Sequence, residues 1–156
     1  MTYLEVSDLT IAFGRRPPAV KGVSFTLGER DRLGIIGQSG SGKSVTILAI
    51  LGLLPESARV TGSIRLEGRE LVGLSEGAYR ELRGNEISMI FQEPMTALDP
   101  TMRVGWQLGE VVALHQADRR GSIRGDVLEW LGRVGITEPP RIADSYPHEL
   151  SGGQRQ

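Results

Sequence analysis

Cysteine is absent from the 156 residues, and several kinds of chemistry are absent with it. Disulfide bonds, zinc sites built on thiolates and cysteine nucleophiles are excluded, and the composition fits a reducing compartment. A net charge of −1 provides no global field that would favour nucleic acid or an anionic membrane. The longest uncharged run, residues 44–55, is too short for a membrane span, which needs roughly 20 apolar residues.

Strand-like segments are frequent in the first part of the chain. Apolar and polar residues alternate over 4–13 and again over 20–27, which predicts strands. Residues 61–66 predict a further short strand. Two apolar runs, 32–36 and 86–91, have the composition of strands buried on both faces of a parallel sheet.

Helical spacing of apolar residues is found in three places. It covers 45–54, where Pro55 ends the pattern, and it returns twice between 106 and 134. The two later helices have apolar faces made of Leu108, Val111, Val112 and Leu114, and of Val127, Leu128, Leu131 and Val134. Pro139-Pro140 and Pro147 frame a predicted loop before the final Ser151-Gly152-Gly153-Gln154.

A glycine-rich segment separates the apolar run at 32–36 from the helix at 45–54. Its residues have the pattern of a phosphate-binding loop: Gly37, Gln38, Ser39, Gly40, Ser41, Gly42, Lys43 and Ser44. Glycines let the backbone approach a phosphate closely, and successive N–H groups at a helix start form an anion site. Lys43 can reach the β- and γ-phosphates, and the Ser44 hydroxyl can hold Mg²⁺. A chance match is the alternative, but the flanking strand and helix favour a nucleotide site that extends to Val45.

Two further motifs resemble those of a known family. The segment Leu150-Ser151-Gly152-Gly153-Gln154, with Tyr146-Pro147-His148-Glu149 before it, resembles the signature sequence of ATP-binding cassette (ABC) proteins. A helix N-cap made of Ser and glycines is the alternative for this segment. Gln92 matches the Q-loop of the family, and residues 91–100 are similar to its peptide-importer branch. Gln38, Ala97 and Asp99 stand where that branch commonly has Glu, Ser and Asn.

The resemblance implies roles for individual residues. Ser151, Gly152, Gly153 and Gln154 would bind the γ-phosphate of ATP held by a second subunit. Gln92 would join Mg²⁺ and the attacking water to the contact with the membrane subunit. Lys43 and Gln92 are therefore the catalytic candidates, and Ser44 and Gln92 are the metal candidates. Phe13 would stack on adenine, with Val20 packing on the same base, although a strand aromatic also fits a core position.

The resemblance also implies a fold, an α/β P-loop NTPase core of the ABC type. It would carry an N-terminal antiparallel β subdomain and an inserted α-helical subdomain. We expect residues 1–92 to form a partial nucleotide-binding core with the β subdomain, 93–150 the helical subdomain, and 151–156 the start of the signature motif. Trp106 and Met102 fit either a contact with a membrane subunit or the core.

Several family motifs are missing from these 156 residues: the Walker B strand with its Asp and catalytic Glu, the D-loop and the switch His. We therefore expect the front portion of a longer ATPase, with the later core strands absent, which does not hydrolyse ATP alone. In the family those later strands lie between the phosphate-loop strand and the Q-loop strand. Without them the two apolar runs would have unpaired edges and an uncovered apolar face.

The leading hypothesis is an ATP-binding subunit, using ATP and Mg²⁺, that powers the import of peptides or a related small solute. Its partners would be a second ABC ATPase subunit, integral-membrane permease subunits and, indirectly, an extracytoplasmic substrate-binding protein, with no nucleic acid expected. This would place it at the cytoplasmic face of the cell membrane as a peripheral protein. The alternatives are a soluble ABC ATPase acting on nucleic acid or ribosomes, and an inactive nucleotide-binding fragment.

Overall fold

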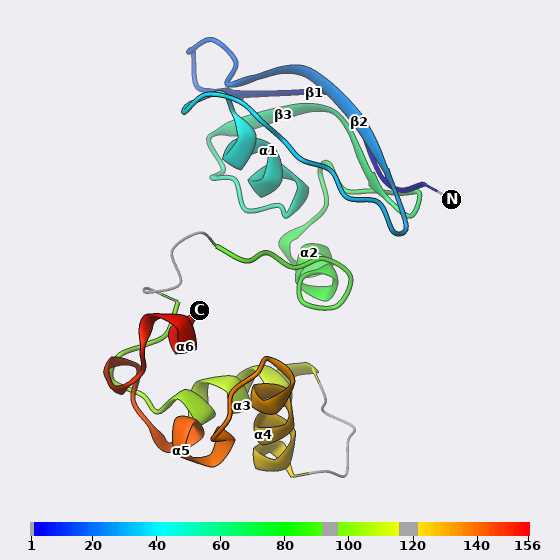
Figure 1. Cartoon of the computed structure of the whole chain (residues 1–156). Helices are drawn as coiled ribbons and strands as arrows, with labels where there is room; N and C mark the ends of the chain where they lie inside the picture. Colours follow the sequence, from blue (N-terminus) through cyan, green and yellow to red (C-terminus); the bar gives the residue numbers. More distant parts are fainter. Residues whose placement is uncertain (1, 92–96, 116–121) are drawn as a thin grey trace. The chain divides into compact units, whose positions relative to one another are not determined.

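The computed structural model describes residues 2–91, 97–115 and 122–156. They fall into two compact units, which we call unit 1 (Met1–Ser88) and unit 2 (Met89–Gln156). Unit 1 contains a sheet with two helices, and unit 2 is helical (Figure 1). The domain boundary expected at 92/93 falls in the segment 92–96, outside the described residues.

Unit 1 is built on a four-stranded antiparallel sheet in the order β2-β1-β3-β4. Its strands are β1 (Thr2–Phe13), β2 (Val20–Gly28), β3 (Ala58–Leu66) and β4 (Arg69–Glu70). β1 is central, because Leu4 pairs with Leu27 of β2 on one side and with Leu66 of β3 on the other. The strands predicted at 4–13, 20–27 and 61–66 are confirmed.

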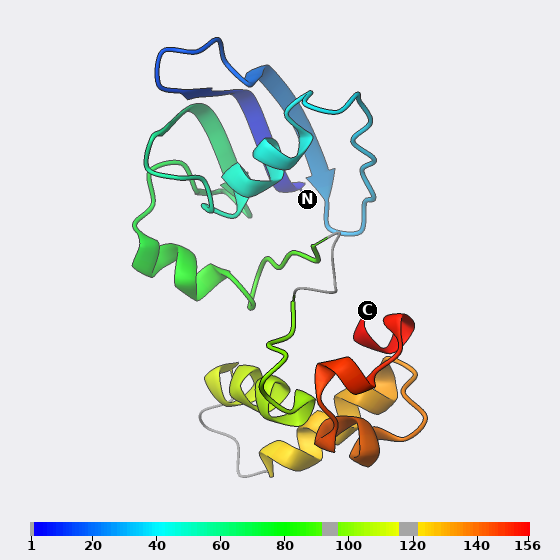
Figure 2. The same cartoon turned by 90° about the vertical axis from the view of Figure 1, so that its left-hand side faces the viewer.

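The helices of unit 1 are α1 (Lys43–Ile50) and α2 (Glu76–Leu82). Figures 1 and 2 show α1 lying across one face of the sheet. Side chains from this face pack with both helices in one core, which contains Val6, Leu9, Ile11, Val20, Ala49, Ile50, Ile64, Leu66, Leu71, Tyr79 and Leu82. This core holds α1, and with it the end of the glycine-rich segment, against the sheet.

α1 ends at Ile50, four residues earlier than its apolar spacing predicts. Gly52 adopts a left-handed conformation with φ 63°, which stops the helix. The N–H of Leu53 donates to the carbonyl of Leu48 at 2.8 Å, and the N–H of Gly52 donates to that of Ala49 at 3.1 Å. These two bonds form a Schellman motif, which satisfies carbonyls that the helix end would leave unpaired.

The two apolar runs predicted as buried strands do not form strands. Residues 32–36 run as an irregular segment between β2 and α1 (Figure 2), and Ile36 is 97% exposed. In the run 86–91, Ile87 makes an isolated bridge to Arg83 while Ile90 is 96% exposed. A strand needs a neighbour to pair its backbone groups, and within the described ranges no strand pairs with residues 32–36.

Unit 2 packs three helices together: α3 (Val104–His115), α4 (Ile123–Arg133) and α5 (Pro139–Asp144). A 3-10 helix, η2 (Pro147–Glu149), and α6 (Gly152–Arg155) follow. The core of this unit contains Val104, Val127, Leu131, Ile142, Ala143 and Leu150. The two helices predicted between 106 and 134 are confirmed.

The apolar faces assigned to those helices are only partly correct. Leu108, Val112 and Leu128 pack against the core, whereas Val111 and Leu114 are 55% and 80% exposed. The loop predicted from Pro139 to Pro147 is wrong over most of its length, because α5 spans Pro139–Asp144. Proline fits the first turn of a helix, where its missing N–H would have no intrahelical partner.

Candidate functional site

The segment 37–42 leads into α1 and folds back around the side chain of Lys43. The Lys43 ammonium donates to the carbonyl oxygens of Gly37 at 2.7 Å and Gln38 at 2.8 Å, and Nζ lies 3.3 Å from Ser41 Oγ. The N–H of Ser41 also donates to the Gln38 carbonyl at 3.2 Å. The loop is therefore closed around its own cation, with Ser39 and Gly40 at its exposed tip.

Gly42 joins this loop to α1 as the N-cap residue, in a left-handed conformation with φ 91°. A Cβ atom here would lie 2.6 Å from the carbonyl oxygen of Ala19 and 3.0 Å from Val20 Cγ2. The buried Thr46 closes the first turn, since its N–H and its hydroxyl both donate to the Gly42 carbonyl, at 2.9 and 3.0 Å. Glycine at 42 thus brings the start of α1 directly against the β1–β2 connection.

This arrangement suits the phosphates of a nucleotide. Ser44 and Val45 lie in the first turn of α1. N–H groups at the start of a helix lack intrahelical partners, and they attract anions. The Ser44 side chain is exposed, and Ser44 directly follows Lys43 in the first turn of α1. Within the described ranges no group of three or more His, Asp or Glu could hold a metal. The Ser44 hydroxyl, together with phosphate oxygens, fits Mg²⁺, which usually takes few protein ligands.

The residues predicted to contact adenine lie at the ends of two paired strands. Phe13 is the last residue of β1 and packs half-buried against the core of unit 1. Val20, the first residue of β2, is 3% exposed and belongs to that core, with Cγ2 beside Gly42. Their contact with adenine stays a prediction. Gln92 lies outside the described residues, so its predicted role also stays a prediction.

The signature-like segment forms the start of α6. Ser151 Oγ accepts a hydrogen bond from the N–H of Gln154 at 3.3 Å, and Gln154 Oε1 accepts one from the N–H of Ser151 at 2.9 Å. This reciprocal capping box satisfies two N–H groups of the helix start. Ser151, Gly152 and Gly153 are exposed, next to the buried Leu150. The capping role is therefore present, and the phosphate-binding role of the same residues stays a prediction.

Trp106 is 70% exposed on α3, so the core interpretation is wrong for this residue. It lines a cavity of about 600 Å³ between α3, α4 and α5. Its lining is mostly apolar and includes the small residues Gly109 and Ala113, and the ion pair of Arg124 with Asp144 also lines it. Met102 is half-buried just before α3.

The sequence profile of the family described as "ABC transporter" matches residues 20–156. The chain belongs to the ABC transporter family. Three relatives, each aligned over at least 98% of this chain, are similar to it along its length. They are the dipeptide transport ATP-binding protein DppD of Bacillus subtilis (strain 168), 47% identical, the oligopeptide transport ATP-binding protein AppD of the same strain, 43% identical, and the peptidoglycan transport ATP-binding protein YejF of Agrobacterium fabrum, 48% identical.

This ABC chain spans less than half the length of those relatives: 47% of DppD, 49% of AppD and 29% of YejF. Among solved structures it is similar to the dimeric structure of MJ0796, a bacterial ABC transporter cassette, with a TM-score of 0.75 and 25% identity. That match covers 97% of this chain and 65% of the cassette. The α/β fold of the ABC type and the resemblance to peptide-import ATP-binding proteins are confirmed. In the part of the ABC chain that the structure describes, no helix is long and apolar enough to cross a membrane.

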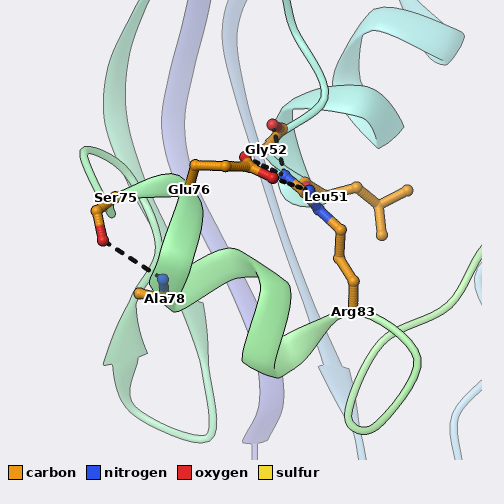
Figure 3. A network of polar contacts seen from close by, with 6 residues as sticks. All are labelled: Leu51, Gly52, Ser75, Glu76, Ala78 and Arg83. Carbon is orange, nitrogen blue, oxygen red and sulfur yellow. Dashed lines mark hydrogen bonds and ion pairs between the residues drawn. The ribbon is translucent and has the colours of Figure 1, made fainter. Parts of the chain in front are cut away.

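Sequence reasoning missed α2 and the contacts that this helix makes. Ser75 was a usable signal, because its Oγ accepts from the N–H of Ala78 at 3.4 Å as an N-cap does, and Glu76 follows in the first turn. Arg83, directly after α2, carried no comparable signal. Its guanidinium reaches back more than 30 positions to the carbonyls of Leu51 and Gly52 (Figure 3).

Proposed function

We propose that the chain is part of the ATP-binding subunit of a peptide importer, and that it binds MgATP through residues 37–45. The full-length protein would hydrolyse this ATP to power transport through a membrane permease. The family membership supports ATP binding, and the names of DppD and AppD support a peptide cargo.

The closed loop around Lys43 is the observation that carries the proposal. The Lys43 ammonium now donates to two neutral carbonyls, at 2.7 and 2.8 Å. Phosphate oxygens are stronger acceptors for this ammonium, because they carry negative charge and add a Coulomb attraction that a neutral carbonyl lacks. Lys43 would therefore turn from its own loop to the β- and γ-phosphates, while α1 presents its first N–H groups. Bound Mg²⁺, held at Ser44, would neutralise phosphate charge.

We also propose a composite site that needs a second ATPase subunit. Ser151, Gly152 and Gly153 would approach the γ-phosphate of ATP bound to that subunit, and Gln92 would join Mg²⁺ and the attacking water. The exposure of these signature residues on a short capped helix supports the idea, as does the dimeric assembly of the MJ0796 cassette.

The cavity beside Trp106 is our candidate for the permease contact. Its mostly apolar lining from α3 and α4 suits an amphipathic helix, and an exposed tryptophan is a frequent anchor at protein interfaces. Docking there would hold the subunit at the cytoplasmic face of the membrane as a peripheral protein.

Nucleotide titration tests ATP binding. We expect Lys43→Ala to weaken MgATP binding by about tenfold or more, because it removes a charged donor to phosphate. Lys21→Ala is the matched control, since Lys21 is an exposed lysine on β2. Equal binding of MgATP by both variants, or no binding by the unsubstituted chain, would reject the proposal. An ATPase assay on the full-length protein then separates an enzyme from a nucleotide binder.

Co-purification of the full-length protein with its permease tests the membrane contact. We expect Trp106→Ala to abolish co-purification. Trp130→Ala is the control, because Trp130 is another half-exposed tryptophan of unit 2, on α4. If the permease co-purifies with the Trp106→Ala variant as well as with the Trp130→Ala variant, the contact lies elsewhere.

A further inference from the structure

Arg83 binds the end of α1, the helix whose start carries the phosphate loop. Its Nε donates to the carbonyl oxygen of Leu51 at 2.7 Å, and its Nη2 donates to that of Gly52 at 2.9 Å (Figure 3). Leu51 is the C-cap of α1, and Gly52 is the next residue. Because the Schellman motif already uses the carbonyls of Leu48 and Ala49, Arg83 supplies donors to the two carbonyls beyond the helix end.

The guanidinium is itself held from two sides by α2. Glu76, the first residue of α2, accepts two hydrogen bonds from it, at 2.8 Å from Nη1 and 3.1 Å from Nη2. The Arg83 guanidinium carbon also lies 5.2 Å from the centre of the Tyr79 ring. The Arg83 side chain is only 23% exposed. A planar guanidinium fixed in this way aims its remaining donors in one direction, which a flexible ammonium does not.

The two helices also meet without space between them. A Cβ atom on Gly52 would lie 2.5 Å from the Tyr79 ring, so α2 packs directly on the end of α1. Tyr79 is fixed in turn, because its hydroxyl donates to the carbonyl of Leu71 at 2.9 Å. The end of α1 is therefore tied to α2 by polar contacts and by close packing.

The length of α1 connects this end to the phosphate loop. The helix has eight residues, so it is about 12 Å long and has only about two turns. Gly42, Lys43 and Ser44 stand at its start. A helix this short moves as a rigid body, and its direction is set by what holds each end. A positive charge at its end also matches the negative pole of the helix dipole.

We propose that Arg83 is a positioning residue for the phosphate loop: by clamping Leu51 and Gly52 to α2, it keeps the first turn of α1 aimed at the nucleotide. The inference rests on the proposed binding of ATP at residues 37–45, and it adds a residue that never touches the nucleotide. Residues of this kind change ligand affinity through the geometry of the groups that do touch it.

Nucleotide titration of the full chain at a temperature where all variants are folded is the first experiment. We expect Arg83→Ala to weaken MgATP binding about five- to tenfold without changing the number of sites, and adenosine binding to stay the same. Arg83→Lys should recover part of the affinity. The control is Arg80→Ala, an exposed arginine of α2. If Arg83→Ala and Arg80→Ala bind MgATP equally well, the inference is wrong. A loss of sites at unchanged affinity, which partial unfolding causes, also overturns it.

Glu76→Gln provides a second variant that leaves Arg83 in place. It removes the charge that orients the guanidinium, so we expect weaker MgATP binding, with a smaller loss than in Arg83→Ala. MgATP affinity unchanged in both Glu76→Gln and Arg83→Lys would count against the inference even where Arg83→Ala does not fold.

Amide hydrogen exchange tests the mechanical link without any nucleotide. The N–H of Thr46 reports on the first turn of α1 through its bond to the Gly42 carbonyl. The N–H of Leu71, bonded to the Ile64 carbonyl, is the reference in the same unit. We expect Arg83→Ala to speed exchange at Thr46 several-fold more than at Leu71. Equal acceleration at both would mean that Arg83 only stabilises the unit. This result decides the inference even if ATP binding itself were rejected.

Discussion

Gly105 of α3 packs directly on the backbone of Ala143 in α5. A Cβ atom on Gly105 would lie 2.8 Å from the Ala143 carbonyl oxygen and 2.9 Å from its Cβ. The neighbouring N–H of Val104 donates to the carbonyl of Ser145 at 3.0 Å, which fixes the start of α3 against the end of α5. The missing side chain at 105 is therefore what lets the helices of unit 2 approach.

Gly105→Ala should destabilise the protein by about 1–3 kcal/mol, because overpacking against backbone leaves no flexible atom to move. Gly109→Ala is the control on the same helix, where the nearest atom is Ile123 Cγ2 at 3.2 Å. The intrinsic helix preference of alanine over glycine, roughly 1 kcal/mol, should offset much of the cost at 109. Urea unfolding measures both. A Gly105→Ala variant as stable as Gly109→Ala would contradict the packing.

Gly42→Ala should disrupt the phosphate loop more than Gly40→Ala does. Both glycines have positive φ, 91° and 80°, so each alanine is strained by about 1 kcal/mol or more. Only at 42 would the new carbon also meet a backbone atom, the Ala19 oxygen at 2.6 Å, whereas at 40 nothing lies within 4 Å. Unfolding free energies and MgATP affinity are the measurements. Equal losses at both positions would show that the contact with Ala19 does not matter.

Glu70 should make unit 1 sensitive to acid. Burial raises the pKa of its carboxyl, but hydrogen bonds from Ser63, Ile64 and Val72, together with Arg65, outweigh burial and hold the pKa below its ordinary value of 4.5. A lowered folded pKa stabilises the fold above pH 4.5, and this stabilisation is lost as the pH falls through the folded pKa. We expect Glu70→Gln to flatten the fall of the unfolding free energy below pH 4.5.

Glu81→Gln is the control for that experiment, since Glu81 is an exposed carboxylate on α2. The unfolding free energy of Glu81→Gln should change with pH in nearly the same way as that of the unsubstituted chain. If Glu70→Gln and Glu81→Gln give the same profile, the hydrogen bonds to Glu70 do not contribute to acid stability.

Substitutions of Ser151 should separate the capping role from the phosphate role. Ser151→Ala removes the cap and should cost about 0.5–2 kcal/mol locally, seen as faster exchange of the Gln154 N–H. Ser151→Asp keeps a good N-cap, but it places a carboxylate where the proposed composite site receives phosphate. We therefore expect Ser151→Asp to retain Gln154 protection and to lose MgATP-dependent association of the full-length protein. Association unaffected by Ser151→Asp would leave the segment with a capping role alone.

Local patterns were sufficient for the antiparallel sheet and for the phosphate loop. β1 and β2 alternate and lie next to each other in the sequence, so their pairing needs no distant partner. The loop was recognisable because glycine, lysine and serine at fixed spacing have a direct chemical reason. The same local logic gave strands at 32–36 and 86–91, and there it was wrong, because a strand also depends on a neighbour that its own residues do not specify.

The contacts that hold the loop in place were not predictable from such patterns. Arg83 looks like any arginine after a helix, and only the folded chain brings it to Leu51. The prediction of the apolar face of α3 was partly wrong for a related reason. Val111 and Leu114 continue the apolar spacing of Leu108, but which of them meets the core depends on where α4 and α5 lie.

The exposed segment 32–36 has a consequence for synthesis in the cell. Leu33, Ile35 and Ile36 are 46%, 40% and 97% exposed, so they form an apolar, β-prone stretch that other chains can reach while the protein is being made. Such a stretch is a natural client for chaperones that bind nascent chains. Protection of this stretch from other chains during synthesis would then affect the yield of soluble protein.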